Sequence, residues 1–85
     1  MKYTIKPITW IDTNFFTGVG SCCSIGAYWL QVRPTGYIDG PFKWRIQQGT
    51  LVLHEGGTDT LEQGQLQCER AWQNYLLKNF LETAL

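Results

Sequence analysis

The chain has few of the side chains on which catalysis and metal binding depend. Its 85 residues include one histidine and three cysteines, two of which are adjacent. Nothing in the sequence brings His54 to a cysteine, so a nucleophile–base pair is not indicated. Zinc sites usually show two cysteines separated by two to four residues, a spacing that Cys22 and Cys23 lack. We therefore expect a protein that is not an enzyme and has no metal or cofactor; a small enzyme that depends on metal or thiol, using these residues and Cys68, is the least favoured interpretation.

Long hydrophobic runs and an excess of one charge are also absent. No apolar run approaches the roughly 18 residues that a membrane span requires, and the segment 1–7 has no apolar core of a signal peptide. Seven basic and seven acidic residues give a formal net charge of zero, which argues against an obligate nucleic-acid coat. An odd number of cysteines fits free thiols in a reducing compartment. We expect a cytoplasmic protein without a membrane partner.

Tryptophan, by contrast, is abundant. Trp10, Trp29, Trp44 and Trp72 are spread so that nearly every predicted element carries one. A chain of this length makes one domain with one core, and large aromatic side chains must supply much of that core. We expect residues 1–85 to form a single domain.

Short segments with strand-like patterns occupy the first two thirds of the chain. The predicted strands are residues 3–10, 22–33, 42–47 and 50–55, with a loop at 11–21, a turn at 34–41 and a break at Gly56-Gly57. The segment 42–47 shows the clearest alternation, in which Phe42, Trp44 and Ile46 face one way and the polar residues face the other. In 22–33, the same pattern places Tyr28, Leu30 and Val32 opposite Trp29, Gln31 and Arg33. These patterns are typical of half-buried antiparallel strands.

A single helix follows. Thr60 and Gln63 have the spacing of a capping box, and the helix is predicted from about residue 60 to about residue 83. Six residues fall on one stripe at helical spacing: Leu61, Gln65, Cys68, Trp72, Tyr75 and Leu76. Gly64 lies on the same face, where a missing side chain would let a strand approach closely. The sequence therefore predicts an α+β fold of order β-β-β-β-α, an antiparallel sheet of three to four strands with one long C-terminal helix packed on one face.

The face of the sheet away from the helix is the first candidate contact surface. Its expected members are Trp29, Gln31, Arg33, Lys43 and Arg45. A tryptophan beside cationic side chains is typical of a protein-binding hot spot, and it can also stack a nucleic-acid base while the cations contact phosphates. A third interpretation is that Phe15 and Phe16 of the 11–21 loop cover Trp29.

The back of the helix is the second candidate. Large apolar residues fall there, where a surface helix is normally polar: Leu66, Leu77, Phe80 and Leu81. Self-association into a homodimer would bury them. The alternative is that the C-terminal end of the helix packs against the 11–21 loop.

The order of these signals resembles a class of small phage and prophage accessory proteins. The similar segments, which span residues 9–75, are Thr9-Trp10, Gly26-Ala27-Tyr28-Trp29-Leu30-Gln31-Val32, Lys43-Trp44-Arg45-Ile46, Leu51-Val52-Leu53-His54, Gly56-Gly57-Thr58-Asp59-Thr60-Leu61-Glu62 and Cys68-Glu69-Arg70-Ala71-Trp72. The chain differs from the class in its Cys22-Cys23 pair and its apolar C-terminal stretch.

This resemblance implies a non-enzymatic protein that acts inside a bacterium during infection or lysogeny. Many such proteins, the anti-CRISPR proteins among them, bind a host defence complex and block it by masking a surface. The expected partner is then a host protein or protein complex, and the alternative is a nucleic-acid-binding module that uses the same sheet face. The class has no shared functional motif, so the resemblance assigns no roles to individual residues.

Overall fold

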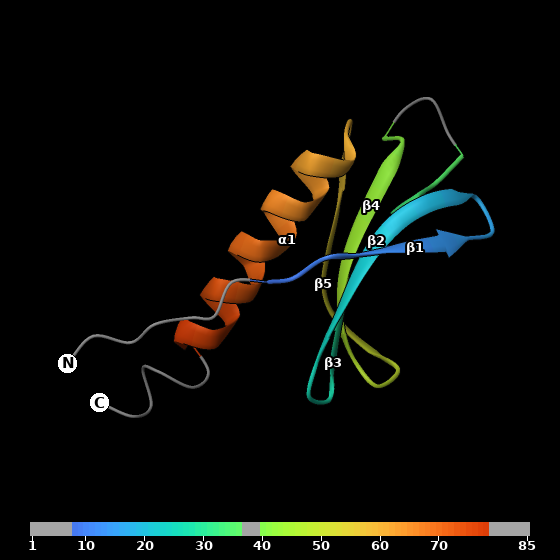
Figure 1. Cartoon of the computed structure of the whole chain (residues 1–85). Helices are drawn as coiled ribbons and strands as arrows, with labels where there is room; N and C mark the ends of the chain where they lie inside the picture. The colour runs from blue at the N-terminus through green and yellow to red at the C-terminus, as the bar shows by residue number, and fades with distance from the viewer. Residues whose placement is uncertain (1–7, 37–39, 79–85) are drawn as a thin grey trace.

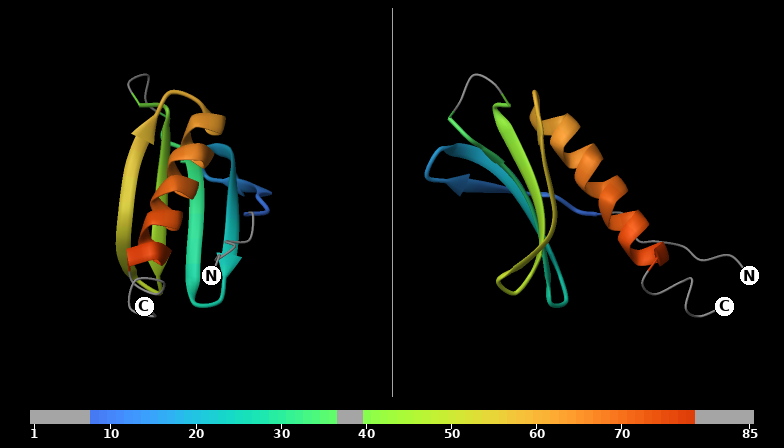
Figure 2. Two further views of the ribbon diagram at one scale, coloured as in Figure 1. Left: turned by 90° about the vertical axis from the view of Figure 1, so that its left-hand side faces the viewer. Right: turned by 180° about the vertical axis from the view of Figure 1, so that it is seen from behind.

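Five antiparallel strands follow one another in a single sheet, and one helix lies across one face of it (Figure 1, Figure 2). The computed structural model describes residues 8–36 and 40–78. Its elements are β1 (Ile11–Phe15), β2 (Gly18–Ile25), β3 (Tyr28–Pro34), β4 (Phe42–Gln48), β5 (Leu51–Thr58) and α1 (Leu61–Leu76). The predicted α+β class, antiparallel sheet and C-terminal helix are confirmed, with one more strand than expected.

The extra strand comes from the segment that was predicted to be a loop. Residues 11–21 form the β1–β2 hairpin, in which Ile11 pairs with Cys22 and Phe15 with Gly18. A Cβ atom on Gly20 would lie 2.1 Å from the Val32 carbonyl oxygen and 2.9 Å from the Phe15 ring, so the glycine lets both the β3 backbone and that ring approach β2 closely. The prediction of a strand at 3–10 is wrong for residues 8–10, which are in no strand, and residues 3–7 lie outside the described part of the chain.

The segment 22–33 is two strands and not one. A two-residue turn at Gly26-Ala27 joins β2 to β3, and Ile25 pairs with Tyr28 across it. Gly26 has φ 58°, a left-handed conformation that glycine adopts without steric cost and that short hairpin turns require. Apolar residues flank the turn on both sides, which hid it in the sequence pattern.

Strand β5 continues through the two glycines that were expected to end it. Trp44 of β4 pairs with Gly56, and a Cβ atom on Gly56 would lie 2.6 Å from the indole Nε1. The indole therefore occupies the space above the glycine backbone. A glycine within a strand often marks such a close approach, so Gly56 here continues the sheet instead of breaking it.

The core lies between the sheet and α1. Its buried hydrophobic residues are Leu30, Val32, Trp44, Ile46, Cys68 and Trp72. The predicted alternation of β3 and β4 is thereby confirmed. Gly64 is buried as expected, because a Cβ atom there would lie 2.6 Å from Cγ1 of Val32, and the helix can approach β3 closely only at a residue without a side chain.

The helix begins as the sequence predicted. The Gln63 backbone N–H donates to Oγ1 of the N-cap Thr60 at 3.1 Å, and the Asp59 N–H donates to Gln63 Oε1 at 3.3 Å. The first bond satisfies a donor that an uncapped first turn would leave free. The second connects the residue before the N-cap to the first turn of the helix. The α-helix extends from Leu61 to Leu76, and the predicted end near residue 83 lies outside the described residues. In the part of the chain that is described, no helix has the length and apolar character needed to cross a membrane.

The two neighbouring glycines of β5 provide a test of the Trp44 contact. Replacing Gly56 with alanine would push a methyl group into the indole, and we expect a loss of about 1–3 kcal/mol in the free energy of unfolding, measured by urea denaturation. Gly57→Ala is the matched control, because the nearest atom to its Cβ would be the Phe42 carbonyl oxygen at an ordinary 3.7 Å. Equal stability of the two variants would show that the indole does not lie on Gly56.

Candidate binding surface on the open sheet face

The face of the sheet away from α1 brings the five predicted contact residues together. We call it the open face (Figure 2). Its central cross-strand pairs are Trp29–Gln47, Gln31–Arg45 and Arg33–Lys43. Side chains of alternate residues point to opposite sides of a strand. The core residues of β3 and β4 face the helix, so these pairs face away from it.

Trp29 is exposed on this face. Its side chain retains 42% of its accessible surface, and its cross-strand neighbours are Ser24 and Gln47. The expectation that Phe15 and Phe16 cover it is wrong. Strand β1 pairs with Gly18–Cys22 only and so ends before it reaches Ser24, while the Phe16 side chain is fully exposed.

Two of the positively charged side chains on the open face, Lys43 and Arg45, form ion pairs with the same carboxylate. Glu55 Oε2 accepts from both Lys43 Nζ at 3.4 Å and Arg45 Nε at 3.2 Å, an interaction that the sequence did not reveal. Among the described residues, no hydrogen-bond or ion-pair partner is found for Arg33, which lies directly across from Lys43. Counting only the side chains that the structure describes, these three cations face one anion, Glu55, and the face is positive.

Gln31 differs from the other four predicted contact residues. It retains only 9% of its accessible surface, and its side-chain Nε2 donates to Gln47 Oε1 at 2.6 Å. Its amide is therefore engaged within the sheet. Gln31 supports the surface around Trp29 but offers little area to a partner, which corrects the expectation that it makes direct contact.

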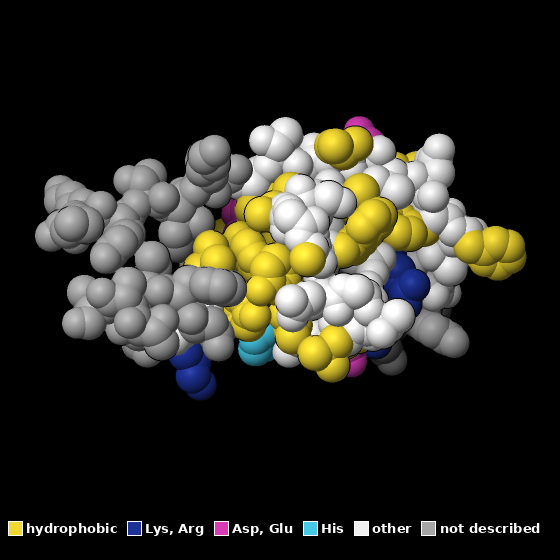
Figure 3. Space-filling model, turned by 90° about the horizontal axis from the view of Figure 1, so that it is seen from below, with side chains coloured by type: hydrophobic (Ala, Val, Ile, Leu, Met, Phe, Trp, Pro, Cys, Tyr) yellow, Lys and Arg dark blue, Asp and Glu magenta, His cyan; other side chains and the backbone are white. Residues whose placement is uncertain are grey.

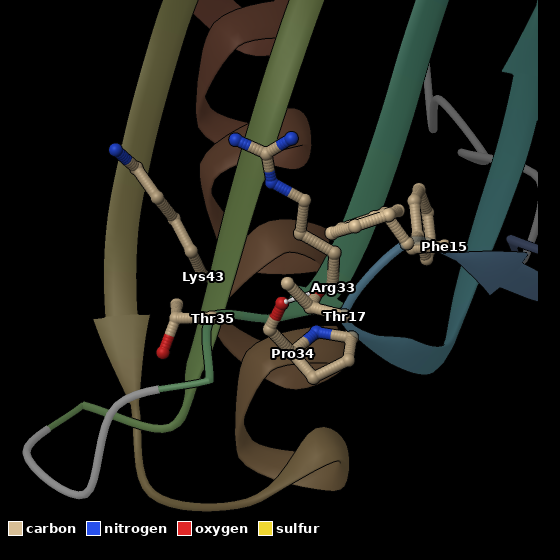
Figure 4. Close-up of a pocket in the computed structure, with 7 residues that line it drawn as sticks. Phe15, Thr17, Arg33, Pro34, Thr35 and Lys43 are labelled. Carbon is tan, nitrogen blue, oxygen red and sulfur yellow. Dashed lines mark hydrogen bonds between the residues drawn. The ribbon is translucent and has the colours of Figure 1, made fainter.

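A hollow of about 580 Å³ lies at the end of the open face, beside the β1–β2 hairpin. Figure 4 labels six of the residues that line it: Phe15, Thr17, Arg33, Pro34, Thr35 and Lys43. The Thr17 hydroxyl donates to the Pro34 carbonyl and ties the hairpin to the end of β3. Sequence reasoning missed this pocket because it treated residues 11–21 as a loop. The alternation of polar and larger residues in Ile11–Phe15 was the one signal for the strand.

Hydrophobic side chains gather on the face of the molecule seen from below (Figure 3), and several aromatic rings contact one another between α1 and the sheet. The ring of Tyr28 lies 5.0 Å from Trp72 and 5.7 Å from Tyr75, centroid to centroid, and the Tyr28 and Tyr75 hydroxyls are 3.2 Å apart. His54 meets the Tyr75 ring edge-on at 6.3 Å. The histidine thus packs with aromatic rings on the helix side of the sheet.

The thiols occupy three different environments. Cys22 pairs with Gln31 and Cys23 with Leu30, so the adjacent thiols point to opposite faces of β2 and cannot share a ligand. The Cys22 sulfur lies 2.9 Å from Thr13 Oγ1. Burial in the core, followed by the charge of Glu69, raises the pKa of the Cys68 thiol to about 12. Within residues 8–36 and 40–78, no three potential metal ligands lie together.

The back of α1 exposes two of its four predicted apolar residues. Leu66 retains 50% and Leu77 45% of their accessible surface, whereas Phe80 and Leu81 lie outside the described part of the chain. The turn of the β1–β2 hairpin and the C-terminal end of α1 lie on opposite sides of the molecule (Figure 1), so Leu77 does not pack against that turn. Self-association through this surface stays a prediction.

Comparison with known proteins finds no matching family model, no similar curated protein and no similar solved structure. A functional interpretation therefore depends on the geometry and the charges of the surfaces described above.

The buried thiol gives a prediction about reactivity and pH. The thiolate is the reactive form, so at pH 9 native Cys68 should react with iodoacetamide at least ~100-fold more slowly than in the urea-unfolded chain. The raised pKa also means that the folded state holds its proton longer. The free energy of unfolding should therefore fall as pH rises from about 9 towards 12. Mass spectrometry of the labelled peptides would measure the rates, with half-buried Cys22 as the internal comparison. Equal labelling of Cys22 and Cys68 would contradict a stable helix–sheet core.

The helix back gives a prediction about mass in solution. If two copies pair through it, the double variant Leu66→Glu/Leu77→Glu should sediment as a monomer while the unchanged protein sediments as a dimer. Asn74→Glu is the control, because it adds a charge at an exposed position of α1 that lies roughly 80° around the helix from Leu66, at 100° per residue. The same mass for the unchanged protein and the double variant would exclude the helix back as the interface.

Proposed function

We propose that this chain is a small non-enzymatic binding protein, acting inside a bacterial cell, that inhibits or modulates a host protein complex by covering one of its surfaces. The observation that carries the proposal is the exposed Trp29 on an open sheet face that also carries Arg33, Lys43 and Arg45. The resemblance to phage accessory proteins supports the anti-defence, anti-CRISPR-like setting.

The difference between the helix-covered face and the open face of the sheet supports a role of the open face in binding a partner. The helix covers the side chains of β3 and β4 that form the core. Trp29 lies on the opposite face and is exposed, so packing of the core does not explain why a tryptophan occupies this position. Tryptophan and arginine are the residues that most often dominate binding energy at protein interfaces. A rigid indole gives a large contact area with little loss of conformational entropy.

The charges favour a protein over a nucleic acid. Glu55 lies within the open face and is bound to both Lys43 and Arg45, so two of the three cations already have an anionic partner. A nucleic-acid strand would place its phosphates near that carboxylate, while a chain with zero formal charge supplies little long-range attraction. A protein with a few acidic groups fits the pattern better.

A nucleic-acid-binding module is the second candidate, because an aromatic ring beside cations is also a platform for single-stranded bases. The two functions differ in salt dependence. Binding of a single-stranded oligonucleotide should weaken steeply and linearly on a logarithmic scale as salt rises, and such a result with the unchanged protein would favour this second candidate.

The central role of Trp29 can be tested by capture from a bacterial host lysate. Trp29→Ala should reduce affinity for the captured partner by about 30-fold or more, since a hot-spot truncation costs at least about 2 kcal/mol. Leu66→Ala is the matched control, because it truncates a similarly exposed apolar residue on the helix back. Quantitative mass spectrometry identifies the partner and biolayer interferometry measures the affinity. Undiminished binding by Trp29→Ala would refute the open face as the contact surface, and loss only with Leu66→Ala would move the contact to the helix.

A further inference from the structure

We infer that the hollow beside the β1–β2 hairpin is a receptor for one carboxylate of the partner, an aspartate or glutamate side chain that has an apolar neighbour. We call it the hairpin pocket. The inference depends on the proposed function, because it names what the end of the open face recognises. Three features carry it: an arginine for which the described residues provide no ion-pair partner, an apolar wall that is in place before binding, and an exposed aromatic ring at the rim.

The first feature is an excess of positive charge. Arg33 and Lys43 lie directly opposite each other on neighbouring strands, and like charges in that position repel. Glu55 offsets Lys43 at 3.4 Å, but among the residues described no carboxylate offsets Arg33. The fold gains nothing from this repulsion, whereas an anion held between the two cations would relieve it.

The shape of the arginine suits a carboxylate. A guanidinium group offers parallel N–H donors that match the two oxygens of a carboxylate. Figure 4 shows the Arg33 and Lys43 side chains extending from adjacent strands in the same direction beside the pocket. One bidentate bond from Arg33, with Lys43 as a second cation, would hold a single anionic group.

The second feature is the wall of the pocket. The Phe15 ring fills the space that Gly20 leaves open, and the Pro34 ring lies 3.1 Å from where a Cβ atom on Gly18 would be. The bond from the Thr17 hydroxyl to the Pro34 carbonyl holds the two sides together. A wall that is in place before binding lowers the entropy lost on association.

The third feature indicates what accompanies the carboxylate. The Phe16 side chain, at the edge of the pocket, is fully exposed, and burying an aromatic ring is among the most favourable contacts an interface can make. An acidic residue beside an apolar one would fill both parts of the site. A polyphosphate chain would satisfy Arg33 but would continue past Glu55, which repels it.

The test is a nuclear magnetic resonance titration with defined probes at fixed ionic strength. The probe is a capped 12-residue peptide of three Glu-Ser-Leu-Ser repeats, compared with the same peptide carrying glutamine for glutamate and with a 12-nucleotide oligo-dT. We expect the glutamate peptide to shift the Arg33 side-chain Nε–H signal and the backbone amides of residues 15–17, and the glutamine peptide to bind at least ~10-fold more weakly.

Variants distinguish binding in the hairpin pocket from nonspecific attraction by positive charge. Arg33→Gln should weaken the glutamate peptide at least ~10-fold, and Arg33→Lys, which keeps the charge but loses the planar fork, should weaken it as well. Arg70→Gln is the control, because it removes an exposed arginine from α1 and should change nothing. Phe16→Ser, at a fully exposed position, tests the rim without touching the fold. The melting temperature of Arg33→Gln should be unchanged or higher, since the repulsion from Lys43 is removed.

The outcomes distinguish this inference from the proposed function. Equal binding of the two peptides, or loss of glutamate-peptide binding in Arg70→Gln but not in Arg33→Gln, overturns the carboxylate receptor. Arg33-dependent binding of oligo-dT that exceeds glutamate-peptide binding overturns it in favour of nucleic acid. With the captured partner, loss of affinity in Trp29→Ala but not in Arg33→Gln refutes the pocket alone, and undiminished affinity in both refutes the open face altogether.

Discussion

The contact between Trp44 and Gly56 holds the two layers of this protein together. The indole lies on the backbone of β5, where a Cβ atom would approach Nε1 to 2.6 Å, and the same Nε1–H donates to Gln67 of the helix at 3.1 Å. One side chain thus joins β4, β5 and α1. Gly64 complements it from the helix, because its missing side chain lets α1 approach Val32. The close packing of helix on sheet follows from these two glycines and one indole.

This packing gives the two faces of the sheet different roles. The central strands β3 and β4 place their apolar residues under the helix, so their alternate residues, Trp29, Arg33 and Lys43 among them, point the other way. The β1–β2 hairpin then ends short of Trp29 and forms a pocket around Arg33. The exposed Trp29 indole and the Arg33 guanidinium, which has no ion-pair partner within residues 8–36 and 40–78, lie at the two ends of one surface. They are the basis of the proposed recognition of an acidic protein partner.

The sequence correctly predicted those helices and strands that are determined by a local sequence pattern. The alternation in Phe42–Gln48 and the Thr60–Gln63 cap are local signals, and both were interpreted correctly. The errors fell at glycines. Gly26 turns the chain between two apolar runs, whereas Gly56 continues a strand because an indole covers it. The sequence does not distinguish these two glycines. Whether a glycine forms a turn or allows a close contact within a strand depends on the residues that surround it in the folded protein.

In the candidate site, too, the sequence pattern determined some features and the tertiary structure decided others. The sequence predicted that Trp29, Arg33, Lys43 and Arg45 share a face, because side chains alternate along a strand and the apolar residues of both strands were expected to face the helix. The sequence also determined the fold class, through one helical stripe that follows several alternating segments. The tertiary structure alone decided that Gln31 is buried, that Glu55 pairs with two of the cations and that Arg33 stands at a pocket built by the hairpin. Burial and pairing depend on which strands become neighbours, and that choice is made by packing across the whole sheet.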